Sequence, residues 1–555
     1  MFRLSSSYSF LPKISFSSPR PDNGLFNRSN LKMTMSSPTS SFDGERFGHA
    51  LVLLTRWPTT GWMLNTNLVG YGVLFATAFP LLLALYNYYL HPVAHVRGPF
   101  IAAVSPIWLI KSVSKHRLNN DIERVHAEYG PVVRIGPNEL SFATEEALKT
   151  IHNPGPDSGY FTKEGTIEAL LGILIWAAPN LLTTTQRTAH KRLRAALQPA
   201  FTAKALMEQE EIVQHHVDRA VERLGAKLTE QTTVSISDHV GKMIWNIVGD
   251  LSFGEPLLHD QMSAYEKLKF TYGRGAPLLE LFQFLTEIPI FGGLAKLPVL
   301  LVPHIFRVPK NFLLMNQLRE CIERQSGRKD FLTAILSAKD SAGLTHAEIL
   351  SNSALFAMVG YDTSATTLSA LFYHVLREPA HYRRIQEEVR GTYSSASEIS
   401  AQSVLRLPYM NACIQETLRL TPPINGRGSH RISPGATIDG VYVPKGVNVS
   451  ADIWTIHRRP DYWALADKFR PDRWTDNGPG TLFEHDVRTS YRPFLVGPRV
   501  CIGREMALQS IRLTVAKMAF TYGLEMENKN TFVWERDAGN DYVWHDYNIL
   551  VRKSG

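Results

Sequence analysis

The sequence predicts a mainly helical domain with a small β-rich region, preceded by one membrane-spanning helix. From about residue 95 onward, apolar residues recur mostly with helical spacing. Near residues 436–450, short alternating runs are interrupted by Asp439-Gly440 and by Pro444-Lys445-Gly446, which is the pattern of β-hairpins. Close to the N-terminus, one uncharged apolar stretch is long enough to span a bilayer as a helix.

The first segment, residues 1–55, is predicted to be a Ser-rich disordered leader or a targeting segment. Residues 1–41 hold twelve Ser and a single acidic residue, a composition that cannot bury a packed core. A second interpretation stays open, because Met33 and Met35 are alternative starts. The residues before them would then not belong to the natural product.

Residues 66–90 are predicted to form a transmembrane anchor. No Asp, Glu, Lys or Arg lies between Arg56 and His91, and a helix from Leu68 to Tyr86 would cross the ~30 Å hydrocarbon core of a bilayer. A buried core helix is the alternative, but the tyrosines at the end of this stretch fit an interfacial aromatic belt. By the positive-inside rule, the basic residues that follow place the remaining chain in the cytosol: His95, Arg97, Lys111, Lys115 and Arg117.

Charge and cysteine content exclude several classes of protein. The formal net charge is +8, but five basic residues and one acidic residue of residues 1–41 account for half of it. The rest is spread without a basic block, which argues against nucleic acid and leaves an acidic protein partner or an anionic lipid surface. Three scattered cysteines, Cys321, Cys413 and Cys501, cannot form a disulfide framework and indicate a reducing compartment.

The stretch FLVGPRVCIG, residues 494–503, is the strongest chemical signal in the chain. A Cys thiolate can hold a haem iron, and Gly497 and Gly503 would let the backbone approach a flat macrocycle. Phe494 would pack beside the loop, and Arg499 would bind an anionic propionate. A buried structural Cys501 is the alternative, but the five fixed residue types would match by chance in a chain of this length with a probability of roughly 10⁻⁴.

This stretch resembles, in full, the haem-ligand loop F-x-x-G-x-R-x-C-x-G of the cytochrome P-450 superfamily of haem-thiolate monooxygenases. The resemblance covers about residues 90 to 550, with several motifs in the family's chain order. It implies the cytochrome P-450 fold for a catalytic domain over residues 91–555, with Cys501 as the metal ligand.

Two further motifs follow from this resemblance. The stretch NACIQETLRLTPP supplies Glu416 and Arg419, which three-residue spacing places on one helix face. Alone, such a pair is routine on solvated helices, but the resemblance adds Arg473 in FRPDRW and implies a buried three-residue network. The resemblance also gives His457 in IWTIHRRP a mainly structural role.

A long helix is predicted from Thr345 to Arg377, because Thr345 and Glu348 form a capping box and Glu378 precedes a proline. In its middle lies VGYDTSATT, where Gly360 lowers helix stability and so suggests close approach of a ligand.

The resemblance makes Asp362 and Thr363, within this stretch, the proton-delivery pair. Taken alone, they would be an exposed acid and an ordinary helix Thr. Val359 departs from the Ala or Gly usual in the family and narrows the oxygen side of the expected pocket, while the proton pair remains intact.

The haem propionates have three more candidate partners. The stretch HKRLRAALQPAF resembles the family's propionate-binding helix, with Arg194 on the motif Arg and His190 in place of the more usual Trp. Arg431 is a further candidate, although its alignment needs a shift of one residue. A basic, solvated helix face is the alternative for His190 and Arg194.

The resemblance implies a monooxygenase that contains haem b (iron protoporphyrin IX) with an axial Cys thiolate and uses O₂. Electrons would come from NADPH through a separate, membrane-bound flavoprotein reductase. The anchor implies a single-pass protein of the endoplasmic reticulum. Two alternatives stay open: a haem-thiolate isomerase or dehydratase without O₂ activation, which would tend to lack the acid–Thr pair, and a non-catalytic haem sensor.

The substrate is expected to be a lipophilic small molecule. Residues 168–182 and 275–306 are apolar and lie where the family builds its pocket roof and its membrane-facing entrance. Either segment could instead be a core helix or a bilayer-contact helix. The phrases YNYYLHPVAHVRGPF and DKFRPDRW resemble fungal enzymes that tailor secondary metabolites such as terpenoids.

Overall fold

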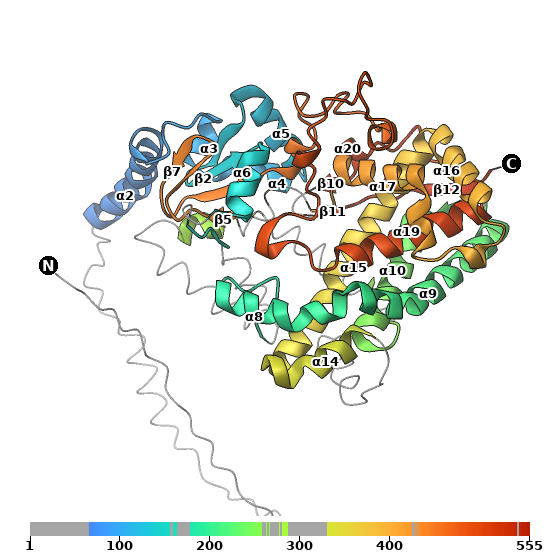
Figure 1. Ribbon diagram of the computed structural model, residues 1–555. Coiled ribbons are helices and arrows are strands. Elements are labelled where there is room, and N and C mark those ends of the chain that lie inside the picture. Colours follow the sequence, from blue (N-terminus) through green and yellow to red (C-terminus); the bar gives the residue numbers. More distant parts are fainter. Residues whose placement is uncertain are drawn as a thin grey trace, which may run out of the picture. The chain divides into compact units, whose positions relative to one another are not determined.

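One long helix, α15, organises the packing of the chain. The computed structural model in Figure 1 describes residues 66–155, 159–163, 178–257, 262–263, 266, 277, 280–286, 330–424, 427, 430–540 and 543–554. Helix α15 packs most extensively against α10 and also contacts α14, α16, α17 and α19.

Helices dominate the described residues, as the sequence predicts. The α-helices are α2 (Thr66–Leu85), α3 (Phe100–Val104), α4 (Ile107–Ser114), α5 (Leu118–Tyr129), α6 (Glu145–His152), α8 (Arg187–Leu197), α9 (Ala203–Glu230), α10 (Ile236–Phe253), α14 (Phe331–Ala342), α15 (His346–Arg377), α16 (Pro379–Thr392), α17 (Pro408–Leu420), α18 (Ile453–Ile456), α19 (Arg504–Thr521) and α20 (Trp534–Asp537). Shorter helical turns are η1 (Tyr86–Leu90), η3 (Gln198–Phe201), η4 (Ala396–Glu398), η5 (Ser403–Arg406), η7 (Pro471–Trp474), η8 (Arg488–Ser490) and η9 (Gly497–Arg499).

The ends of α15 lie where the sequence predicts them. Thr345 is the N-cap, and its hydroxyl accepts a hydrogen bond from the backbone N–H of Glu348 at 3.2 Å. The Glu348 carboxylate accepts in return from the backbone N–H of Thr345 at 2.9 Å, which completes the capping box. Glu378, which precedes Pro379, is the C-cap.

The strands are short and form small sheets. They are β1 (Val132–Gly136), β2 (Glu139–Phe142), β3 (Thr162–Lys163), β4 (Val234–Ser235), β5 (Arg431–Ile432), β6 (Ala436–Ile438), β7 (Val441–Val443), β8 (Asn448–Ala451), β9 (Leu524–Met526), β10 (Gly539–Asn540), β11 (Trp544–His545) and β12 (Leu550–Lys553). The largest has the order β1-β2-β8-β5-β3, so strands from distant parts of the chain become neighbours. The other sheets have the orders β4-β12-β9, β6-β7 and β10-β11.

The predicted hairpin is present between β6 and β7. The two strands are antiparallel, with Ala436 opposite Val443 and Ile438 opposite Val441. Asp439 and Gly440 between them have φ of +49° and +78°, the two positive values that a type I′ turn requires.

The N-terminal predictions lie largely beyond the described part of the chain. The chain divides into two units, residues 1–75 and 76–555, and the leader predicted for residues 1–55 is outside the described residues. Helix α2 occupies residues 66–85 of the predicted anchor. Among the described residues, no helix combines the length and apolar character of a membrane-crossing span.

Buried histidines tie helices of the core together. On α10, His239 is 5% exposed, and its Nε2 lies 2.8 Å from the carbonyl oxygen of Ala220 on α9. Burial lowers the pKa of His239 to about 4, so the folded protein keeps this imidazole neutral. Below about pH 6.5 an unfolded chain binds a proton at His239 that the folded chain does not bind. Folding stability therefore decreases as the pH is lowered from about 6.5 to about 4.

We expect His239→Gln to flatten the loss of stability in acid. The glutamine amide can still donate to the Ala220 carbonyl but cannot be protonated at these pH values. In the unaltered protein, His239 should account for a loss of up to roughly 3 kcal/mol between pH 6.5 and pH 4. Urea denaturation at a series of pH values measures this slope, and equal slopes in the two proteins would contradict the assignment.

Candidate active site

Cys501 lies in a tightly turned loop directly before helix α19. Its backbone N–H donates to the carbonyl oxygen of Phe494 at 3.1 Å, and the N–H of Val500 donates to the carbonyl oxygen of Gly497 at 3.0 Å. Leu495 has φ of +62°, a left-handed conformation that costs a residue with a side chain about 1–3 kcal/mol. The Phe494 ring packs against the hydrophobic core. Backbone bonds and this packing therefore hold the loop in an otherwise unfavourable shape.

The two glycines of the loop differ in their structural reason. Gly497 has φ of +77°, and a Cβ there would lie 2.2 Å from the carbonyl oxygen of His152. Gly503 has φ of −88°, and a Cβ there would meet nothing within 4 Å. At Gly497, both the positive φ and the nearby carbonyl oxygen require glycine. At Gly503, no described protein atom would clash with a side chain.

Charge and hydrogen bonding act on the Cys501 thiol in opposite directions. Burial is the largest influence and raises its pKa, while the N–H of Gly503 and the positive charges of Arg194 and Arg504 favour the thiolate. The Cys501 side chain is nevertheless exposed. An exposed Cys residue near two guanidinium charges is an environment in which a thiolate can serve as a metal ligand.

A cluster of cations lies around His190 on α8. Burial, and then the positive charges of the neighbouring cations, lower the pKa of His190 to about 4, and these cations are Arg499, Arg194, Lys163 and Arg431. Lys163 and Arg431 are 8% and 4% exposed. Arg194 also donates to the carbonyl oxygen of Val500 at 2.7 Å, which connects α8 to the Cys501 loop. The structure therefore brings the predicted residues His190, Arg194, Arg431 and Arg499 into one cluster.

The strand pairing explains why this cluster favours an anion. Antiparallel pairing of β3 with β5 places Lys163 directly opposite Arg431, and like charges in this position destabilise a sheet. Two buried nitrogen atoms, Arg499 Nε and His152 Nε2, have no hydrogen-bond partner in the described part of the chain. This donor set fits the carboxylates of the two propionates expected for haem.

Sequence reasoning missed Lys163 and His152. Each is an isolated basic residue in its stretch of sequence and belongs to no motif. Lys163 reaches the cluster only because β3 pairs with β5, which lies far away in the chain. His152 reaches the Cys501 loop because its carbonyl oxygen packs against Gly497.

The middle of α15 has one open face. Between Glu348 and Leu376 every residue is buried except Val359, Gly360 and Thr363. These three lie at positions i, i+1 and i+4 and therefore on the same side of the helix. The Thr363 hydroxyl donates to the carbonyl oxygen of Val359 at 2.9 Å. Asp362, the other half of the predicted proton pair, is 6% exposed.

At Gly360 the packing of two helices also favours glycine, whereas the approach of a ligand stays a prediction. A Cβ at Gly360 would lie 3.1 Å from Cγ1 of Val248, so close packing of α10 against α15 favours glycine. The same Cβ would lie 3.8 Å from Cε of Met506, in the first turn of α19. The open face of α15 and the helix that follows Cys501 are therefore neighbours.

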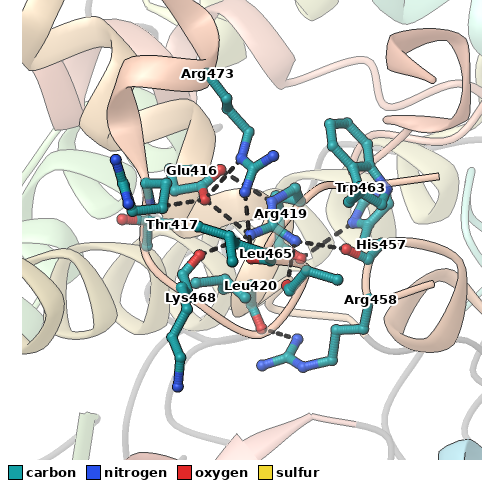
Figure 2. A network of polar contacts seen from close by, with 12 residues as sticks. Glu416, Thr417, Arg419, Leu420, His457, Arg458, Trp463, Leu465, Lys468 and Arg473 are labelled. Atoms are coloured by element: carbon teal, nitrogen blue, oxygen red, sulfur yellow. Dashed lines mark hydrogen bonds and ion pairs between the residues drawn. The ribbon is translucent and has the colours of Figure 1, made fainter. Parts of the chain in front are cut away.

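A buried ion pair between Glu416 and Arg419 forms the centre of a polar network (Figure 2). Both side chains are 0% exposed, and two N–H···O bonds of 2.8 and 2.9 Å join them. Arg473 Nε adds a third bond to Glu416 at 3.0 Å, and the Trp474 indole and the Arg470 backbone N–H donate to the same carboxylate. Burial alone would raise the pKa of Glu416, but its bonds to Arg419 and Arg473 hold this pKa below its usual range.

Arg419 extends this network toward the Cys501 loop. Its remaining N–H groups donate to three backbone carbonyl oxygens, those of His457, Ala466 and Lys468, at 2.7 to 3.0 Å (Figure 2). All five guanidinium donors are therefore satisfied. His457 in turn accepts from the backbone N–H of Arg492 at 3.1 Å, two residues before Phe494.

Comparison with known proteins identifies the family. The family model described as Cytochrome P450 matches residues 99–550. The chain belongs to the cytochrome P450 family. Over 477 aligned residues it is 48% identical to Cytochrome P450 monooxygenase btcB of Colletotrichum orbiculare. The aligned residues are 84% of this chain and 89% of that protein.

Two more relatives cover the chain to a similar extent. This P450 is 47% identical over 484 residues to Cytochrome P450 monooxygenase dpfgJ of Gibberella zeae, or 86% of this chain and 93% of that protein. It is 36% identical over 523 residues to Sesterfisheric acid synthase of Neosartorya fischeri, or 86% of this chain and 95% of that protein. The chain is therefore a P450 monooxygenase, an oxidoreductase of the fungal secondary-metabolism type.

Several predicted features of this P450 lie in residues that the structure does not describe. Cys321 and most of the apolar segments 168–182 and 275–306 lie outside the described residues. Cys413 is described, and it is a fully buried core residue of α17.

We expect Glu416→Gln to destabilise the fold by about 3–5 kcal/mol. The substitution leaves Arg419, which is 0% exposed, without the charge that balances it, and leaves Arg473, also 0% exposed, paired only with the carboxylate of Asp486. Glu525→Gln is a matched control, because its ion pair with Arg552 is exposed and should contribute less than about 1 kcal/mol. Urea denaturation measures both losses, and losses of similar size would contradict this role of the network.

We expect Gly497→Ala to destabilise the P450 more than Gly440→Ala. The two glycines have nearly the same φ, +77° and +78°, so both substitutions introduce the same backbone strain. Only at Gly497 would the new Cβ collide with a backbone oxygen, since Gly440 has open space around it. Thermal unfolding of the two variants measures the difference, and equal shifts would show that the loop can move to avoid the contact.

Proposed function

We propose that this P450 hydroxylates or otherwise oxidises a lipophilic small molecule at a haem b held by Cys501. The observation that carries the proposal is the exposed residue Cys501 in a loop that a hydrogen bond from Arg194 connects to a cluster of cations. Thiolate-ligated haem, when bound, supplies the activation of O₂ that inserts one oxygen atom into a substrate.

The protein's own residues would hold and orient the cofactor. Arg499, Arg194 and Arg431, together with His190 and Lys163, would bind the propionates through charge-assisted hydrogen bonds. The unpaired Nε of Arg499 supports this role. Gly497 and Phe494 would shape the loop, while Gly503 would leave room for a flat macrocycle next to Cys501.

Thr363 and Asp362 would deliver protons to the reacting oxygen. Thr363 lies on the open face of α15, where its hydroxyl oxygen can accept a hydrogen bond while its proton is held by Val359. Asp362 is the adjacent buried carboxyl group that can accept and release protons. This pair supports O₂ activation over the isomerase or dehydratase alternative.

The substrate would be a fungal secondary metabolite, for example a terpenoid. Val359, an apolar side chain that is 38% exposed on the open face of α15, supports an apolar binding surface. The uncharged character of residues 168–182 agrees with this, apart from Glu168. A relative 36% identical to this chain is named Sesterfisheric acid synthase, and this name supports the proposed class of substrate.

Electrons would come from NADPH through a separate flavoprotein reductase. The net positive charge of the chain favours an acidic protein partner.

Residues 66–90 would anchor the protein in the endoplasmic reticulum membrane, with the catalytic domain in the cytosol. Helix α2 contains no acidic residue in its first turn and no basic residue in its last. Large apolar side chains in its second half and in the segments that follow it are exposed: Leu81, Leu82, Tyr89, Leu90, Phe100, Ile101 and Ile107. These residues would rest in the membrane interface.

We expect Cys501→Ser to abolish the red-shifted Soret band that the reduced carbon monoxide complex of a thiolate-ligated haem shows. Serine keeps the size of the side chain but offers no thiolate to the iron. Cys413→Ala is the control, because Cys413 is buried in the core and should leave the band unchanged. Absorption spectra of the purified proteins decide this. A band typical of histidine-ligated haem in the unaltered protein would remove Cys501 from its role.

We expect the full chain to resist extraction from microsomes by alkaline carbonate. A chain that begins at residue 91 lacks the apolar anchor and should be released into the supernatant, or be bound only through its exposed apolar side chains. Equal release of the two chains would contradict the proposed anchor.

A further inference from the structure

A second opening lies on the side of α15 away from Val359 and Thr363. It is a cavity of about 530 Å³. It is lined by residues of α10, α15, β4, the stretch from His545 to Asn548 and single residues of other segments, and most of these residues are polar: His116, Ser235, Ser237, Asp238, Gly241, Met262, Glu266, Tyr361, Ala365, His545, Asp546, Tyr547 and Asn548. At ~30 Å³ for each water molecule, the volume has room for more than a dozen waters.

The cavity leads from solvent to the surface of α15. At its outer side, the side chains of Asp238 and Asp546 are 44% and 63% exposed. At its inner side, Tyr361 and Ala365 on α15 are 7% and 4% exposed. Since the lining carries carboxylates, hydroxyls and imidazoles along this depth, water can occupy it.

A short hydrogen bond lies at the inner side of the cavity. The Tyr361 hydroxyl donates to Glu266 Oε1 at 2.6 Å. The Tyr361 ring packs edge-to-face on Trp245, with 5.1 Å between ring centroids. Tyr361 therefore has a fixed orientation and holds the Glu266 carboxylate against α15.

Helical geometry places Asp362 between this cavity and the open face. At 100° for each residue, Tyr361 and Ala365 point to the cavity side, whereas Val359 and Thr363 point to the other side. Asp362 lies between these two directions, and Thr366 lies one turn further along the same stripe. The Thr366 hydroxyl is hydrogen-bonded at 2.9 Å to Tyr547, which lines the cavity. Asp362 therefore lies next to Tyr361, which lines the cavity, and one turn before Thr366, which is hydrogen-bonded to a lining residue.

We propose that this cavity is the proton inlet of the enzyme and that Glu266, positioned by Tyr361, is a proton-relay residue for Asp362. The inference rests on the proposed function, because it concerns how Asp362 is reprotonated. Its grounds are the cavity, the Tyr361–Glu266 bond and the position of Asp362 at the edge of the cavity face.

The relay conserves protons and electrons. Each oxygenation consumes O₂, two electrons and two protons and yields one oxidised substrate and one water. For each proton, water in the cavity protonates the Glu266 carboxylate. Glu266 then returns to its carboxylate form as the proton passes through water to Asp362, and solvent replaces the proton. No other reactant is needed.

The test compares Glu266→Gln with the unaltered enzyme. Glutamine keeps an oxygen that can accept the Tyr361 hydrogen bond, so a purely structural role of Glu266 would be preserved, whereas proton transfer would be lost. The purified P450 is mixed with a reductase, NADPH and O₂ without added substrate. The rate of NADPH oxidation, the share of electrons recovered as hydrogen peroxide, and the solvent deuterium isotope effect on the rate are measured.

We expect Glu266→Gln to slow NADPH oxidation at least about fivefold, raise the peroxide share and increase the solvent isotope effect. Glu266→Asp, which keeps an ionisable group, should restore part of the rate, and Tyr361→Phe should show a smaller defect of the same kind. Thr363→Ala serves as the reference for a variant that uncouples NADPH use, and Glu525→Gln as the remote control.

The spectrum of the reduced carbon monoxide complex separates the possible failures. If Glu266→Gln keeps the thiolate band but matches the unaltered enzyme in rate, peroxide share and isotope effect, the inlet proposal is wrong and the proposed function stands. If the unaltered protein lacks the thiolate band, the proposed function and the inlet proposal both fail.

Discussion

The architecture depends on the buried pairing of Glu416 with Arg419. Each of these side chains is fully removed from solvent, and such a burial is tolerable only when every charge and donor finds a partner. The structure meets this condition by directing three backbone carbonyl oxygens and a second arginine at the pair. The segments that supply these partners, residues 457 to 473, are consequently held in one arrangement, and the loop that ends at Cys501 continues from it through His457 and Arg492.

The charge around the Cys501 loop differs from that of the Glu416 network. Here positive charges accumulate on Arg194, Arg431 and Lys163, with Lys163 and Arg431 facing each other across a strand pair. In the Glu416 network the protein supplies both signs of charge, whereas in this cluster the proposed cofactor would supply the negative sign. The contrast separates a structural network from a proposed binding site on physical grounds, although both contain buried basic residues.

The long helix α15 has two sides with different surroundings, which a sequence pattern does not distinguish. Its capping box, its length and its pre-proline end follow from local interactions, and the structure agrees with all of them. At Gly360 the protein itself adds a reason for glycine, because Val248 of another helix lies close to where a Cβ would be. The exposure of Val359 and Thr363 within an otherwise buried helix likewise depends on what the rest of the fold leaves uncovered.

The sequence by itself determined the helical class, the hairpin at Asp439-Gly440, the family and the residues that carry its motifs, because each of these depends on residues close together in the chain. Only the tertiary structure decided which distant residues join them. Lys163 joins the cation cluster through strand pairing, His152 reaches the Cys501 loop through a backbone contact, and Glu266 is hydrogen-bonded to Tyr361 at the cavity. Such contacts leave no periodic or motif signal, since their geometry exists only after the chain has folded.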